Sequence, residues 1–232
     1  MQIIEQTGFG VRSAVIRMVR LSGGPTFLLF PMLHVASPAF YRQMQERMFA
    51  CDVLVVEGVG GNRAKVITLA YRIAGRVRRS GLVLQSESVK MADYHGTVIR
   101  PDMTAKEFGS VWRTLSFGLR VLLYLATPLV GLWIAILGPR RTLGNSLALD
   151  DLPTAKEEEL THEQMEEVFL RSRDAALIRS LSELVDAPAD GPITVGVVWG
   201  ARHMRAVVTA LHARGYVPRS GDWIMAIPPD WR

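Results

Sequence analysis

The sequence contains a single cysteine, Cys51, in 232 residues. It can therefore form no intramolecular disulfide and no metal site built from a cluster of cysteines. The N-terminus also lacks a basic segment followed by an apolar core, the pattern that directs secretion. We expect a cytoplasmic protein, with membrane association as an alternative because of an apolar stretch in mid-chain.

Two further absences exclude classes of partner. The glycine-rich segment at residues 58–61 lacks the Gly-Lys-Ser/Thr ending of a phosphate-binding loop. Lysine and arginine outnumber aspartate and glutamate by 27 to 22, for a formal net charge of +5, but the basic residues are spread along the chain. They lack the interleaved aromatic residues that proteins use to bind single-stranded nucleic acid. We therefore expect no nucleic acid among the partners.

The chain does have the composition of a globular protein and an alternation of strand-like and helix-like segments. Hydrophobic residues make up 49% of it and charged residues 21%, and its length suits one domain. Short apolar runs bounded by Gly or Pro predict strands at 11–21, 26–33, 52–57, 81–85, 96–100, 195–199 and within 215–227. Helical patterns lie at 39–50, 62–79, 102–115, 154–184 and 204–214. This order predicts an α/β fold with a largely parallel sheet flanked by helices, and the first two strands form a hairpin.

Four polar side chains follow predicted strands directly or after a few residues: His34, Glu57, Asp102 and His203. In an open α/β sheet such positions converge on one crevice at the carboxyl edge. Two imidazoles and one or two carboxylates suit Zn, Mn, Fe or Co, with coordination positions left for water. Without a metal, a histidine and Glu57 could act as a general base and its orienting partner. The sequence therefore predicts a hydrolytic site in which His34, Glu57 and His203 are catalytic and all four are candidate metal ligands.

Two arginines complete this predicted site, and several of its members have structural alternatives. Arg63 and Arg173 could clamp a carboxylate or a developing oxyanion. Asp102, directly after Pro101, could instead be a helix N-cap. Glu57 could pair with Arg63 or cap the loop that follows it, and Arg173 could be a solvated residue of an amphipathic helix.

An apolar stretch in mid-chain is the least ordinary part of the sequence. Residues 121–138 carry no formal charge and lie between Arg120 and Arg140-Arg141, at the lower edge of transmembrane length. A single span would place His34 and His203 on opposite sides of a bilayer, and Pro128 favours a kink. We predict a helical hairpin, an arm at residues 117–141 inserted in the single domain, that packs on the body, pairs with a second subunit or contacts a membrane. A helix buried in the core is the alternative.

Several motifs occur in an order that resembles a known family. They are the strand ending at His34 with Ser37 after it, the strand 52–57 with Arg63, residues 102–104 with 111–117, residues 171–174, and Trp199-Gly-Ala-Arg-His203 with Gly215-Tyr216. Over most of the chain they resemble a TraB/PrgY-type protein of the TIKI, erythromycin-esterase and ChaN-like superfamily. The resemblance implies a mixed α/β sandwich with paired Gly-x-x-His motifs around one cleft, in which Ser37, Arg63 and Arg173 bind substrate.

The same resemblance implies an activity. Family members studied as enzymes are metal-dependent peptidases or metal-independent ester hydrolases, TraB-type members are linked to peptide-pheromone shutdown, and some relatives bind haem iron. The first motif departs from the pattern, because Pro31-Met-Leu-His34 lacks its glycine. We therefore expect a hydrolase of peptides or esters, with or without Zn, Mn or Co. The alternatives are a binding protein that sequesters a peptide or a metal-porphyrin in the same cleft, and a scaffold whose site has decayed.

Overall fold

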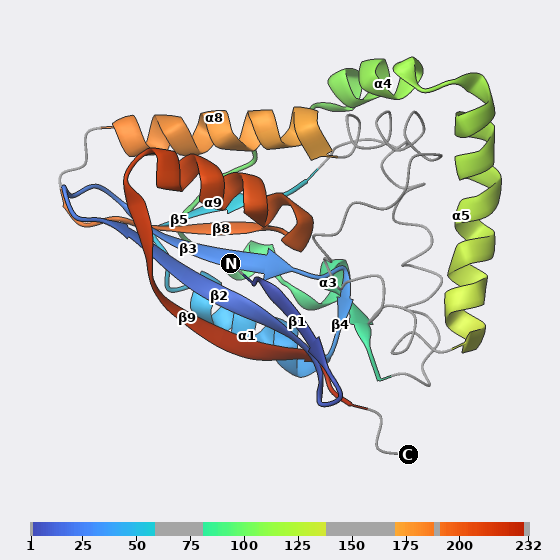
Figure 1. Ribbon diagram of the computed structural model, residues 1–232, viewed down its shortest axis with the longest axis horizontal. Coiled ribbons are helices and arrows are strands. Elements are labelled where there is room, and N and C mark those ends of the chain that lie inside the picture. Colours follow the sequence, from blue (N-terminus) through green and yellow to red (C-terminus); the bar gives the residue numbers. More distant parts are fainter. Residues whose placement is uncertain (1, 59–80, 138–169, 188–190, 230–232) are drawn as a thin grey trace.

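The computed structural model describes residues 2–58, 81–137, 170–187 and 191–229. Seven strands of these ranges form one mixed sheet (Figure 1). They are β1 (Ile4–Thr7), β2 (Gly10–Arg20), β3 (Thr26–Met32), β5 (Val53–Val56), β7 (Thr97–Ile99), β8 (Thr194–Gly200) and β9 (Tyr216–Ile227). The mixed, largely parallel α/β fold expected from the sequence is confirmed.

The sheet has a parallel part and an antiparallel part. Strands β3, β8, β5 and β7 lie side by side in this order and are parallel. Strand β2 pairs antiparallel with β3, as the predicted hairpin requires, and pairs with β9 along its other edge. Strand β1 pairs with the first residues of β2. The four parallel strands therefore direct their carboxyl ends to one edge of the sheet, which is where sites form in such folds.

Helices cover both faces of the sheet (Figure 1). On one face lie α8 (Ser172–Asp186) and α9 (Met204–Ala213), which bury Leu177, Leu181, Val207 and Leu211 against alternate residues of the strands. On the other face α1 (Pro38–Met48) buries four residues, namely Phe40, Tyr41, Met44 and Met48. Full burial of such a side chain contributes about 1.5–3 kcal/mol, so these two layers hold the sheet edge in place.

A few predicted elements have a different place in the structure. The strand expected at 81–85 is reduced to β6 (Val83–Leu84), which pairs with β4 (Val35–Ala36) in a separate two-stranded sheet and leads into the short helix α3 (Gln85–Ser88). A 3-10 turn, η2 (Met91–Asp93), precedes β7. The helix expected at 62–79, the acidic segment at 154–169 and Arg63 lie outside the described residues.

The expected apolar hairpin is wrong for the residues described. Helix α4 (Ala105–Thr114) ends, the hydroxyl of Ser116 accepts a hydrogen bond from the amide of Leu119, and α5 (Phe117–Leu137) then runs for 21 residues without reversing. Its backbone stays helical past Pro128, because one missing backbone donor costs stability without forcing the chain to turn back. Within the described ranges, no helix is long and apolar enough to cross a membrane.

Candidate active site

The four strand-end residues lie at the carboxyl edge of the parallel strands. His34 comes two residues after β3 and Glu57 directly after β5, while Asp102 and His203 each come three residues after β7 and β8. A 3-10 turn, η4 (Ala201–His203), carries His203 from the strand into α9. The end of β3 is in register with the end of β8, since Met32 pairs with Gly200. The topology thus gathers these residues at one end of the sheet, as expected.

Arg173 connects two of the carboxylates. Its Nε and Nη2 atoms donate to Oδ1 and Oδ2 of Asp102 at 2.9 and 2.6 Å, and Nη2 also donates to Oε1 of Glu57 at 2.6 Å. The Asp102 side chain has no exposed surface, and those of Arg173 and Glu57 are 11% and 17% exposed. Charge-assisted bonds of this bidentate kind are the strong ones. Arg173 is therefore fixed in place by residues from two strand ends, and it is not a solvated surface residue.

Backbone amides donate further hydrogen bonds to the same two carboxylates. Gly58 and Met103 donate to Asp102 at 3.0 and 2.8 Å, and Gly200 donates to Oε2 of Glu57 at 2.7 Å. A Cβ atom at position 200 would lie 3.2 Å from that same Oε2. A glycine here lets the amide and the carboxylate approach this closely, which gives the glycine of the Gly-x-x-His motif a physical role.

Asp174 fixes the tautomer that a neutral His203 adopts. Its Oδ1 lies 2.6 Å from Nδ1 of His203, and the two side chains are only 19% and 5% exposed. A carboxylate only accepts hydrogen bonds, so this contact assigns the proton of a neutral His203 to Nδ1. Its Nε2 atom then has a free lone pair.

That lone pair faces Glu57. The Nε2 atom of His203 lies 3.9 Å from Oε1 of Glu57, too far for a direct hydrogen bond. One water molecule that bonds to both atoms at about 2.8 Å suits this separation. The two side chains therefore frame a position for a single polar atom.

The side chain of Trp199 packs against both Arg173 and His203. Its fully buried ring lies 5.3 Å from the Cζ atom of Arg173 and meets the imidazole of His203 edge-on, with centroids 5.1 Å apart and planes at 83°. Guanidinium over an indole face and an edge-on aromatic pair are both favourable. The strand residue thus fixes the orientation of two site residues at once.

His34 shares the electrostatic environment of the site. The residue is exposed, yet the protein around the imidazole removes enough water for burial to be the largest influence on its pKa, which it lowers. The negative charge of Glu57 acts to raise the pKa of His34, and the charges of Arg173 and His203 act to lower it. A side-chain hydrogen bond with Gln85 also acts to raise it. The net result is a lowered pKa. His34 is therefore neutral at neutral pH.

The side chains of Glu57 and Arg173 are both charged at neutral pH. Burial acts to raise the pKa of Glu57, but Arg173, His203 and His34 together hold that pKa below its usual range. Burial likewise disfavours the charge of Arg173, and the bonds to Asp102 and Glu57 outweigh it and raise the pKa of the guanidinium. An Arg⁺ between two carboxylates is the arrangement in which each charge stabilises the others.

This arrangement gives no support to a bound metal. The Glu57 and Asp102 oxygens all accept hydrogen bonds already, and the positive charge of Arg173 between them would repel a divalent cation. In the part of the chain that the structure describes, no group of three or more His, Cys, Asp or Glu side chains could hold a metal ion. Metal ligation by His34, Glu57, Asp102 and His203 stays a prediction.

The structure also shows what two other residues singled out in the sequence, Ser37 and Asp102, do in the fold. The hydroxyl of Ser37 accepts from the amide of Phe40 at 3.2 Å and so caps α1, while its role in substrate binding stays untested. The N-cap of α4 is Thr104, which forms a capping box with Glu107, so the alternative of Asp102 as the cap is wrong. Arg63, which the sequence predicts to bind substrate, lies outside the described residues.

Three residues of the site have no role assigned from the sequence. They are Asp174, Trp199 and Gln85. Asp174 directly follows Arg173, so the pattern Arg-Asp at the start of a helix is visible, but helical spacing alone does not show which strand end each side chain meets. Nothing in the local pattern marks Gln85 as a partner of His34.

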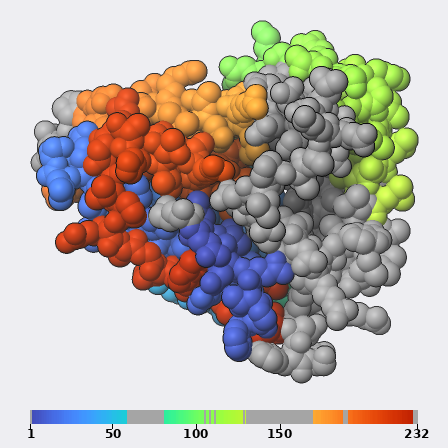
Figure 2. Space-filling view, viewed as in Figure 1, coloured from blue at the N-terminus to red at the C-terminus, as the bar shows by residue number. Residues whose placement is uncertain are grey.

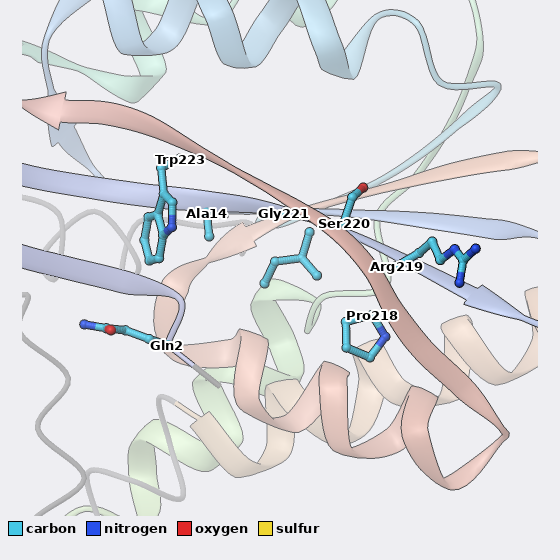
Figure 3. Close-up of a pocket in the computed structure, with 8 residues that line it drawn as sticks. Gln2, Ala14, Pro218, Arg219, Ser220, Gly221 and Trp223 are labelled. Atoms are coloured by element: carbon cyan, nitrogen blue, oxygen red, sulfur yellow. The ribbon is translucent and has the colours of Figure 1, made fainter.

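A separate pocket lies on strands β2 and β9 (Figure 3). Ala14, Ser220, Gly221, Trp223 and Arg219 are among its lining residues, and none of the candidate site residues takes part. Its lining contains no pair of an acid or base with a nucleophile, so we assign no chemistry to it.

No family model matches the chain, and neither a curated protein nor a solved structure matches it. The resemblance to the TraB/PrgY-type family therefore stays an expectation, and the proposed function rests on the geometry of the site.

Proposed function

We propose that the chain is a hydrolase in which His203 and Glu57 activate a water molecule for attack on the carbonyl carbon of an ester or a peptide. One observation supports this most. Oδ1 of Asp174 lies 2.6 Å from Nδ1 of His203, so a neutral imidazole carries its proton on Nδ1, and its Nε2 lies 3.9 Å from Oε1 of Glu57. A neutral imidazole nitrogen with a free lone pair is the usual general base at neutral pH.

The proposed reaction has two steps that share one proton. The water transfers a proton to Nε2 of His203 while its oxygen bonds to the carbonyl carbon, and Asp174 stabilises the imidazolium that forms. When the tetrahedral intermediate collapses, the bond to the leaving group breaks. The proton on Nε2 then moves to the leaving oxygen or nitrogen, and His203 is neutral again.

Arg173 is the proposed oxyanion donor. Its Nε and Nη2 atoms are engaged by Asp102 and Glu57, and none of the described residues accepts a hydrogen bond from Nη1. As far as the described residues go, the two N–H groups of Nη1 are therefore left for the developing negative charge. Donors that are held in place before the reaction stabilise such a charge most effectively. Glu57 then orients the water and holds Arg173, and it does not itself need to take the proton.

The test is turnover on a panel of p-nitrophenyl esters and fluorogenic peptides. Wild type should hydrolyse at least one member, and His203→Ala should lose about a hundredfold or more of that rate, the usual contribution of a general base. His212→Ala, an exposed histidine on α9, is the matched control and should behave as wild type. Equal rates for wild type and His203→Ala would refute the proposal.

The same panel separates the alternatives. Measurement with and without a chelator, together with metal analysis of the purified protein, decides whether a metal takes part. A ligand that binds wild type, loses affinity in His34→Ala and His203→Ala, and is never converted to product would favour the sequestering protein.

A further inference from the structure

Helix α5 has an almost wholly apolar sequence, and many of the side chains described in its first 13 residues are exposed. We call the exposed residues the apolar row, and they are Phe117, Val121, Leu122, Tyr124, Leu125 and Leu129, with exposed fractions of 39–75%. Single exposed hydrophobic residues are normal in proteins, but a contiguous group marks an interaction surface. Figure 2 shows α4 and α5 in green along one flank of the molecule. A helix apolar on all sides is usually covered by a core, by lipid or by a partner.

The charged residues nearest to the apolar row in the sequence are arginines. From position 108 to position 149 the sequence has no Asp or Glu, and its charged residues are four arginines. Arg113 is exposed on α4, and Arg120 lies over the ring of Phe117 at 5.9 Å, next to the row. Two arginines therefore lie beside the apolar row in the sequence, while the acid of α4, Glu107, lies in the first turn of that helix and Arg113 in its last.

We propose that the apolar row docks on a membrane surface that contains anionic lipid, with α5 lying along the interface. The acyl chains cover the row, and the lipid phosphates supply the negative charge that the segment lacks. Tyr124 is 46% exposed and packs edge-on against Trp112 at 6.0 Å, and tyrosine is enriched at the level of the head groups.

A second copy of this chain is a poorer partner for the same surface. A two-fold dimer places the same patch of both subunits together, so both sides of the interface would bring arginines to it. Among the described residues of this stretch, positions 108–137 hold no acid to pair with them. Charge complementarity therefore favours lipid over self-association.

The experiment is flotation of the full chain with two kinds of vesicle, one of pure phosphatidylcholine and one with about a third phosphatidylglycerol. We expect the protein to float with the anionic vesicles, to remain behind with the neutral ones, and to be released by high salt. The triple substitution Leu122→Glu, Leu125→Glu and Leu129→Glu should abolish flotation. Arg113→Glu should reduce the partition constant about fivefold or more.

Leu21→Glu is the control for adding charge at an exposed leucine. Leu21 is 93% exposed at the end of β2, and its substitution should leave flotation unchanged. Circular dichroism confirms that each variant is folded. The proposal is overturned if wild type binds neither vesicle, if it binds both equally, or if the triple variant still floats. A dimer in light scattering that the triple substitution dissociates, without vesicle binding, would overturn it in favour of a second copy as the partner.

Discussion

The Oδ1 atom of Asp174 lies 2.6 Å from Nδ1 of His203, although 29 positions separate the two residues in the sequence. The contact joins the first turn of α8 to the turn that follows β8. On the neighbouring position of α8, Arg173 binds Glu57 and Asp102. One helix start therefore fixes both the proposed base and the proposed oxyanion donor.

Asp174→Asn tests the assigned proton of His203. An amide can donate to Nδ1 and so stabilises the tautomer with its proton on Nε2, which cannot act as the base. We expect kcat to fall about a thousandfold or more with little change in KM. Asp186→Asn, which loses a charge in the exposed pair with Arg214, is the control and should keep full activity. Equal kcat values for Asp174→Asn and wild type would argue against the assignment.

Asp102→Asn tests the buried ion pair. The substitution removes a carboxylate with no exposed surface and leaves Arg173 with a single charged partner. We expect the free energy of unfolding to fall by about 3 kcal/mol, measured by urea denaturation. The same change at Asp222, whose bond to Arg47 is exposed, should cost no more than about 1 kcal/mol. Similar losses at both positions would contradict the role given to Asp102.

Glu57→Gln tests the pH dependence of stability. The pKa of Glu57 is lower in the folded protein than its ordinary value of 4.5. The carboxylate therefore contributes stability that is present above that value and is lost as the pH falls through the lower, folded-state pKa. The difference in unfolding free energy between wild type and Glu57→Gln should be largest near neutral pH and should shrink below about pH 4.5. A difference that grows on acidification would contradict the sign.

Gly200→Ala tests the close approach at the end of β8. The added Cβ would lie 3.2 Å from Oε2 of Glu57 and 3.6 Å from Cδ2 of His203, so the carboxylate must shift. We expect a loss of about 1 kcal/mol in stability and a larger loss in kcat. At Gly221 the nearest atom to a new Cβ is 3.9 Å away, and Gly221→Ala should leave kcat unchanged. An active Gly200→Ala enzyme would show that the site tolerates the shift.

Much of the sheet can be predicted from the sequence, because each parallel strand is an apolar run that ends at a polar residue. The positions of His34, Glu57, Asp102 and His203 at one edge follow from that pattern and from the topology of α/β folds. The capping box of α4 is also visible in the sequence, as Thr-x-x-Glu at residues 104–107, and it is a stronger signal for the helix start than Asp102 after a proline.

The remaining features depend on tertiary contacts. Short apolar runs do not reveal which strand they pair with, so the separate sheet of β6 and β4 could not be predicted. Pro128 favours a kink locally, but the chain continues as one helix. The partner of His203 could not be predicted because three polar residues in succession, Ser172, Arg173 and Asp174, begin α8 and their directions depend on its packing.

The most direct test of His203 as the general base is the rate of ester hydrolysis by His203→Ala with and without added imidazole. If Nε2 of His203 takes the proton from water, the variant should be nearly inactive, and imidazole should restore part of the rate in proportion to its free-base concentration, while wild type and His212→Ala are unaffected. A variant that hydrolyses the ester at the wild-type rate without imidazole would contradict that role.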